Sequence, residues 1–96
     1  MSIFKYRVSY EFLGPSKEDP FATKPLSPDQ VRHYLEGLSS ILPPHFSATL
    51  KDNSLSVTAI TSDSEQDTDT ALERRVANLN IATPGLSLVI EKLSGQ

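Results

Sequence analysis

The sequence predicts an α+β fold in which two helices cover one face of a four-stranded antiparallel sheet. Within 96 residues the hydrophobic patterns follow the order strand, helix, strand, strand, helix, strand. The two middle strands are separated by only two residues, which is the spacing of a β-hairpin. Apolar side chains occupy alternate positions of the strands, as in a sheet with one buried and one solvated face. Right-handed crossovers then place the strands in the spatial order 4-1-3-2.

Residues 3–13 form the first predicted strand, because apolar and polar side chains alternate strictly along them. The apolar side of this strand consists of Phe4, Tyr6, Val8, Tyr10 and Phe12. Gly14 and Pro15 end the pattern, and residues 14–25 contain three prolines among charged side chains. We interpret residues 14–25 as a long loop, a kind of segment that often carries function, and its one aromatic residue is Phe21.

The first helix is predicted to begin at Ser27, which has Pro28 after it and Gln30 three positions later. These residues match a capping box with proline at the first helical position. The apolar stripe of the helix consists of Val31, Tyr34, Leu35, Leu38, Ile41 and Leu42. Pro43 and Pro44 end the helix, because proline has no backbone N–H to continue it.

Residues 46–51 and 54–61 predict a hairpin around the two-residue turn Asp52-Asn53. In this register Leu50 lies opposite Leu55, and every apolar residue of both strands falls on one face. The same register places Ala48 opposite Val57 and Phe46 opposite Ala59. A slip of one residue would turn the apolar side chains to the other face, so the pairing is well specified.

Residues 62–70 are acidic and polar and predict the entry to a second helix. The start of this helix stays open, because Ser62 with Glu65 and Thr70 with Glu73 both have capping-box spacing. Its weaker apolar stripe consists of Ala71, Leu72, Val76, Leu79 and Ile81. Residues 82–85 break the helix, and the last strand starts with the alternating Leu86, Leu88 and Ile90. We expect residues 1–96 to form a single domain.

This order of elements resembles the ferredoxin-like βαββαβ plait, an architecture that hosts many unrelated functions. Its open sheet face is predicted to carry Lys5, Arg7, Ser9, Glu11, Ser47, Thr49, Lys51, Ser56, Thr58, Ser87, Val89 and Glu91. RNA-recognition domains share the plait, and they stack bases on aromatic side chains of the open face. The open face predicted here is rich in hydroxyl groups and has no aromatic side chain, which disfavours base stacking.

The composition excludes several kinds of site. The chain has no cysteine, so disulfides, thiolate metal ligands and thiol nucleophiles are excluded. Nine basic and twelve acidic side chains give a formal charge of −3, which argues against nonspecific nucleic-acid binding. The amino terminus has no signal-peptide pattern and no segment is apolar enough to span a membrane, so we expect a cytoplasmic protein.

No motif in the sequence predicts a catalytic residue, a metal or a cofactor. The acidic series Asp63, Glu65, Asp67 and Asp69 lacks the glycine and the final glutamate of a calcium loop, and we expect Arg74 and Arg75 to balance its charge. His33 and His45 are scattered, whereas a zinc site needs three or four converging ligands. The four glycines are isolated, so no phosphate-binding loop is predicted.

The sequence is most consistent with a small non-catalytic protein-interaction module that binds a protein partner or itself. The contact surface is predicted to be the open sheet face, a strand edge or the 14–25 loop. The candidate partner-binding residues are Arg7, Ser9, Thr49 and Thr58 on the face and Phe21 in the loop. A first alternative is a nucleic-acid-binding domain that uses Lys5, Arg7 and Lys51. A second is a small-molecule-binding or hydrolytic domain of acylphosphatase-like architecture, although the glycine-containing anion cradle of such an enzyme is missing.

Overall fold

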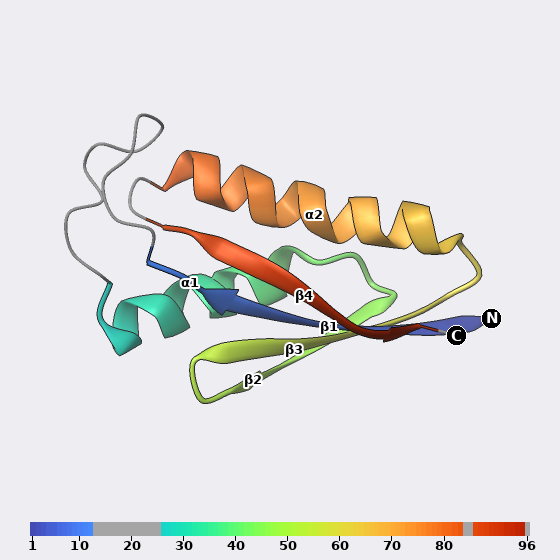
Figure 1. Ribbon diagram of the computed structural model, residues 1–96, viewed down its shortest axis with the longest axis horizontal. Coiled ribbons are helices and arrows are strands. Elements are labelled where there is room, and N and C mark those ends of the chain that lie inside the picture. Colours follow the sequence, from blue (N-terminus) through green and yellow to red (C-terminus); the bar gives the residue numbers. More distant parts are fainter. Residues whose placement is uncertain (13–25, 84–85, 96) are drawn as a thin grey trace.

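The computed structural model describes residues 1–12, 26–83 and 86–95 (Figure 1). It contains the six predicted elements in the predicted order. They are β1 (Ser2–Tyr10), α1 (Pro28–Ile41), β2 (Phe46–Lys51), β3 (Ser54–Thr61), α2 (Glu65–Ala82) and β4 (Leu88–Gly95). The predicted 14–25 loop, with its Phe21, lies outside the described residues, as does residue 13 at the predicted end of the first strand.

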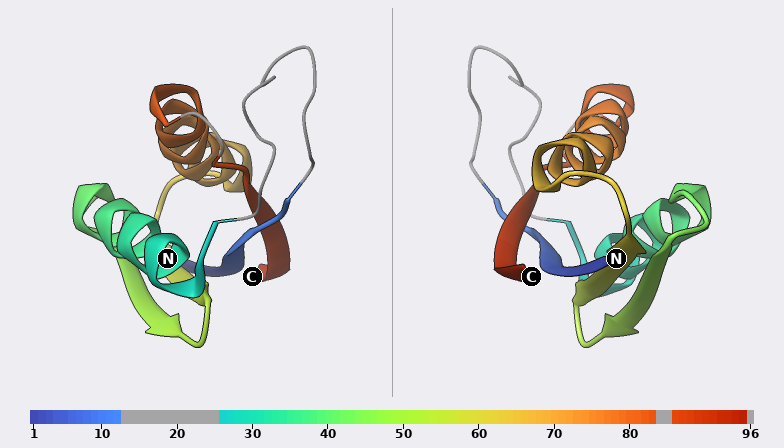
Figure 2. Two further views of the ribbon diagram at one scale, coloured as in Figure 1. Left: turned by 90° about the vertical axis from the view of Figure 1, so that its left-hand side faces the viewer. Right: turned by 90° about the vertical axis from the view of Figure 1, so that its right-hand side faces the viewer.

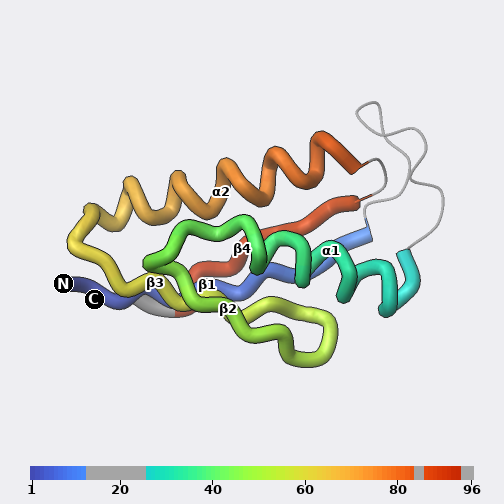
Figure 3. Tube along the Cα trace, turned by 180° about the vertical axis from the view of Figure 1, so that it is seen from behind, coloured from blue at the N-terminus to red at the C-terminus, as the bar shows by residue number. Residues whose placement is uncertain are grey.

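The four strands form one antiparallel sheet with the order β2-β3-β1-β4. This is the predicted ferredoxin-like order, in which the first and third strands occupy the centre. Figure 2 shows both helices on the same side of the sheet. Figure 3, which views the molecule from behind, shows that the helices extend along the strands. Neither helix combines the length and apolar composition that a membrane span requires.

The β2–β3 hairpin has the predicted register. Leu50 pairs with Leu55, and Lys51 pairs with Ser54 to close the two-residue turn. Asp52 has a φ of 54°, in the left-handed region that aspartate tolerates better than most residues. A two-residue hairpin turn requires such a conformation because its twist must match the twist of the strands. The choice of turn residues and the hydrophobic pattern therefore specify the same pairing.

The core lies between the sheet and the two helices. Its buried residues are Phe4, Tyr6, Val8, Val31, Leu35, Leu38, Phe46, Leu55, Val57, Ala59, Leu72, Val76, Leu86 and Leu88. Three residues predicted for this core are instead exposed: Phe12 (41 %), Ile41 (50 %) and Ile81 (82 %). Phe12 is exposed because β1 ends at Tyr10 and not at residue 13. Ile81 lies two positions after Leu79, about 200° further around the helix axis, so it faces away from the core. Ile41 is the last residue of α1, and half of it stays exposed.

The start of α1 is as predicted, and the start of α2, which the sequence left open, lies at Ser64. The Ser27 hydroxyl accepts the Gln30 N–H at 3.3 Å, and the Gln30 side chain accepts the Ser27 N–H at 3.0 Å. In α2, neither predicted capping box forms, because Ser64 is the cap and its hydroxyl accepts the Asp67 N–H at 3.1 Å. Most of the predicted 62–70 entry is therefore helical, and its carboxylates lie at the helix N-terminus, where the backbone dipole favours them.

Gly37 gives a direct test of how α1 is stabilised. Apart from its neighbours along the helix, a Cβ atom added at this exposed position would meet no described atom within 4 Å. Glycine in a helix interior costs about 0.5–1 kcal/mol relative to alanine because it loses more backbone freedom on folding. We therefore expect Gly37→Ala to raise the free energy of unfolding by that amount in urea titrations. A loss of stability would mean that this part of the helix surface is covered.

Candidate interaction surface

The open face of the sheet carries one continuous polar row across all four strands. Thr49 of β2 pairs with Ser56 of β3, Ser56 pairs with Arg7 of β1, and Arg7 pairs with Glu91 of β4. Alternation along the strands turns these side chains away from the helices, and all four are exposed. Arg7 and Thr49, which the sequence predicts as partner-binding residues, therefore lie in the same row.

The other predicted partner-binding residues of the face lie in the neighbouring rows. Thr58 is opposite Lys5, and Ser9 is opposite Ser54. Thr58 and Ser9 are both half-buried, whereas Arg7 and Ser56 on the same two central strands are exposed. The structure thus brings the four predicted residues of the sheet onto one surface, while Phe21 falls outside the described residues.

The charge of the open face is positive, although the whole chain is acidic. Lys5, Arg7 and Lys51 are exposed on this face, against Glu91 within its strands and Glu11, which is exposed just after the end of β1. Arg7 Nη1 lies 3.3 Å from Glu91 Oε2, and both side chains are about half exposed or more, so this ion pair contributes little to stability. Lys5 and Lys51 make no salt bridge to another described residue, which leaves their charges available at the surface.

The open face also has apolar side chains that were not predicted to lie there. Ile3 and Ile60 lie directly opposite each other on the two central strands, and they are 41 % and 49 % exposed. Ile3 is two positions from Lys5, and Ile60 is two positions from Thr58, so strand alternation places each isoleucine on the same face as its neighbour. This alternation could have predicted their location. In β4, Leu93 is 45 % exposed and stands at the register shift next to Lys5 and Tyr6. Two adjacent isoleucines provide an apolar contact at one end of a basic face.

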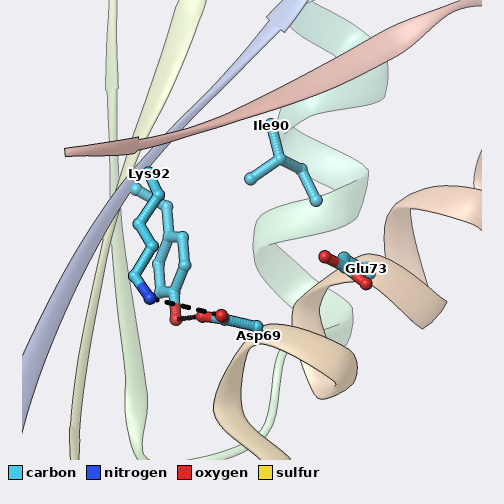
Figure 4. Close-up of a pocket in the computed structure, with 5 residues that line it drawn as sticks. Asp69, Glu73, Ile90 and Lys92 are labelled. Atoms are coloured by element: carbon cyan, nitrogen blue, oxygen red, sulfur yellow. Dashed lines mark hydrogen bonds and ion pairs between the residues drawn. The ribbon is translucent and has the colours of Figure 1, made fainter. Parts of the chain in front are cut away.

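A second cluster lies on the covered side, where β1 and the edge strand β4 meet α2 (Figure 4). The buried Tyr6 hydroxyl donates to Asp69 Oδ1 at 2.5 Å. Lys92 Nζ donates to Asp69 Oδ2 at 3.2 Å and also pairs with Glu65. The Lys92 ammonium group lies 5.9 Å from the centre of the Phe4 ring, within range of a cation–π contact. These contacts connect both strands to the first two turns of α2.

A hollow of about 120 Å³ adjoins this cluster and is lined by Tyr6, Asp69, Glu73, Ile90 and Lys92. Burial, assisted by the hydrogen bond to Asp69, raises the pKa of the Tyr6 hydroxyl well above its ordinary value of 10.0. The hydrogen bond to Glu65 is the main cause that raises the pKa of Lys92. Tyr6 therefore stays neutral and Lys92 stays charged at neutral pH. Both groups donate hydrogen bonds to carboxylates, and neither is set up as a base or nucleophile.

The same cluster corrects one prediction about charge. Arg74 and Arg75 were expected to balance the acidic start of α2, but Lys92 of β4 pairs with Glu65 and Asp69 instead. Arg75 donates to the backbone carbonyls of Ile41 and Ala71, so it supports the C-terminal end of α1. Lys92 was missed because 23 residues separate it from Asp69. The available signal was a buried tyrosine, whose hydroxyl usually needs a polar partner.

The two histidines occupy separate places. His33 is exposed on α1 with its ring centre 5.6 Å from that of Tyr34, whereas His45 is half-buried before β2 with its ring 4.7 Å from that of Phe46. Among residues 1–12, 26–83 and 86–95, no three histidine, aspartate or glutamate side chains are grouped so that they could hold a metal ion.

Comparison with known proteins adds no functional information to this geometry. No protein-family model, no curated protein and no solved structure matches the chain.

Proposed function

We propose that this chain is a non-catalytic protein-interaction module whose open sheet face binds a protein segment with acidic and apolar side chains. The observation that carries the proposal is the charge of this face. Three exposed cations lie on its strands, whereas the complete chain has a formal charge of −3. Complementary charge steers association and selects among partners, so a face of opposite sign to the rest of the molecule favours an acidic ligand.

A protein segment fits this face better than a nucleic acid. Single-stranded nucleic acids bind through aromatic platforms combined with cationic grooves, and the described strands of the open face carry no aromatic side chain. In place of aromatic rings the face has the exposed pair Ile3 and Ile60. Aliphatic side chains beside hydroxyl groups and lysines suit a peptide with alternating apolar and acidic residues.

An enzymatic role has less support from the arrangement of polar groups. The most perturbed hydroxyl, that of Tyr6, already donates to Asp69, and the nearest cation, Lys92, pairs with two carboxylates. A general acid or base must be free to exchange a proton with a bound substrate. The Tyr6 cluster instead connects three elements of the fold.

The proposal is tested by titrating the protein with a peptide of alternating glutamate and leucine while recording backbone amide NMR shifts. We expect the largest shifts in β1, β2 and β3, and binding that weakens as salt is added. Lys5→Glu combined with Lys51→Glu should weaken binding about tenfold, because each exposed charge contact contributes about 0.2–1 kcal/mol and reversal adds repulsion.

A matched control reverses two cations outside the sheet, through Arg32→Glu combined with Arg74→Glu on the exposed sides of the helices. This variant has the same net charge as the first, so it should bind the peptide with nearly wild-type affinity after correction for ionic strength. Equal weakening by both variants, or shifts confined to the helices, would contradict the proposal. Tighter binding of a single-stranded oligonucleotide than of the peptide would favour the nucleic-acid alternative.

A further inference from the structure

The two edges of the sheet differ in how well they are protected against pairing with another strand. On β4, the Asn80 side-chain amide accepts the Leu88 N–H at 2.9 Å and donates to the Leu88 carbonyl at 3.1 Å. The Asn80 amide therefore forms hydrogen bonds with both the N–H and the C=O group of Leu88, and these two groups are not available to another strand. The β4 register also shifts opposite Lys5 and Tyr6, as at a β-bulge. A side-chain block, a bulge and charged residues are the devices that prevent edge-to-edge pairing.

The edge formed by β2 has no such block within the described part of the chain. Ile60 donates its N–H to the His45 carbonyl at 3.0 Å, which identifies this as a hydrogen-bonded pair of the β2–β3 ladder. Hydrogen-bonded pairs alternate in an antiparallel ladder, so the N–H and C=O groups of Phe46, Ala48 and Leu50 face outward. The Phe46 N–H already donates to the Pro43 carbonyl at 3.0 Å. Of these three residues, Ala48 and Leu50 therefore keep both an outward N–H and an outward C=O group for a further strand.

We propose that β2 pairs antiparallel with β2 of a second copy of this chain, in a register centred on Thr49. In this register Ala48 of each copy lies opposite Leu50 of the other, and the outward groups of these two residues satisfy one another. The two four-stranded sheets then become one continuous sheet, and the two open faces lie side by side.

The side chains favour a second copy as the occupant of this edge. Thr49 lies on the two-fold axis and faces Thr49 of the other copy, and facing threonines stabilise paired strands. Lys51 faces Ser47, so no charged side chain lies opposite one of the same sign. A contact limited to six-residue strands buries less surface than a stable dimer needs, so we expect weak association that depends on concentration.

A single cysteine tests the register directly, because the chain has none of its own. Facing residues of a non-hydrogen-bonded pair have Cα atoms about 4.5 Å apart, which is within the range that a disulfide spans. We expect Thr49→Cys to form a disulfide-linked dimer under mild oxidation, with a yield that rises with protein concentration. The matched control is Ser56→Cys, which is exposed on the same face one strand further from the edge.

The control variant should stay largely monomeric under the same oxidation. Equal cross-linking of the two variants would indicate collision through the open face, and no cross-linking of Thr49→Cys would also overturn the proposed register.

Sedimentation velocity without oxidation gives a second readout that needs no cysteine. The wild-type sedimentation coefficient should rise with concentration, whereas Thr49→Lys should remain monomeric because it places two lysines face to face. Ser56→Lys should still associate. A wild-type protein that is monomeric at every concentration would overturn the self-pairing proposal, while the binding of an acidic peptide to the open face could still be observed in the monomer.

Discussion

Replacing Leu38 by alanine should lower the free energy of unfolding by about 2–5 kcal/mol, the range measured for leucine truncation in protein cores. Leu38 is fully buried in α1, and the core that it belongs to includes residues from both helices and all four strands. The effect combines the lost transfer free energy of the side chain with the cavity that remains, because the surrounding helix and sheet relax only partly. Urea denaturation monitored by circular dichroism measures the change.

Two further variants show whether burial is the cause. Val57→Ala, in the middle of β3, should also destabilise the protein, but by less than Leu38→Ala because it removes fewer buried carbon atoms. Ile41→Ala lies in the same helix as Leu38 at a position that is half exposed, so it should change stability by less than about 0.5 kcal/mol. A small effect at Leu38, or a large one at Ile41, would contradict the observed orientation of α1.

The elements of this fold could be predicted because each is specified by local signals that agree. The period-two pattern of β1 identifies its buried side, the Ser27 capping box marks the start of α1, and the Asp52-Asn53 turn fixes the hairpin register. The errors occur at element ends. Phe12 continues the strand pattern beyond the residue where pairing stops, and Ile81 continues an apolar series after the helix has rotated away from the core.

The contacts between elements could not be predicted in the same way. Alternation assigns Tyr6 and Lys92 to faces of the sheet, but it does not say which turn of α2 lies above them. That position depends on how α2 packs across β1 and β4, and residues 63 positions apart come into contact as a result. The basic open face was visible in the sequence as Lys5, Arg7 and Lys51. The different protection of the two edges was not, because it depends on the Asn80 side chain and on the β4 bulge.

Stability should fall steeply above about pH 10 because of the Tyr6 cluster. The ordinary pKa of a tyrosine hydroxyl is 10.0, and in the folded protein burial and the hydrogen bond to Asp69 raise the pKa of Tyr6 above that value. In alkaline solution the unfolded chain loses this proton first, while the folded protein retains it. The folded state then binds more protons than the unfolded state, and a rise in pH therefore favours unfolding. The contribution of Tyr6 is complete below pH 10 and is lost as the pH approaches its folded pKa.

Lys92 changes stability in the same direction. Its pKa is raised above the ordinary 10.5 by its contacts with Glu65 and Asp69, so the folded protein also holds this proton more strongly than the unfolded chain. The two groups together should make the decline steeper than either alone. For Tyr6 alone, the limiting slope is about 1.4 kcal/mol per pH unit between its unfolded and folded pKa values.

Tyr6→Phe separates the two contributions. At neutral pH the variant should be less stable by about 1.5–3 kcal/mol, the usual contribution of a hydrogen bond to a charged group, because the ring is kept and only the hydroxyl is removed. Between pH 9 and 11 its stability should fall less steeply than that of the wild type, since only the Lys92 contribution remains among these two groups. The measurement is a series of urea titrations at fixed ionic strength across this pH range.

Tyr34→Phe is the matched control, because this tyrosine is half-buried on α1 and the ring is again retained. Tyr34→Phe leaves the Tyr6–Asp69 hydrogen bond intact, so we expect this variant to retain the steep alkaline decline. If Tyr6→Phe also kept the full wild-type slope, the proton on Tyr6 would not be coupled to folding. The hydrogen bond to Asp69 would then not make the stability depend on pH. Among these two groups, the pH-dependent connection between α2 and the strands would depend on Lys92.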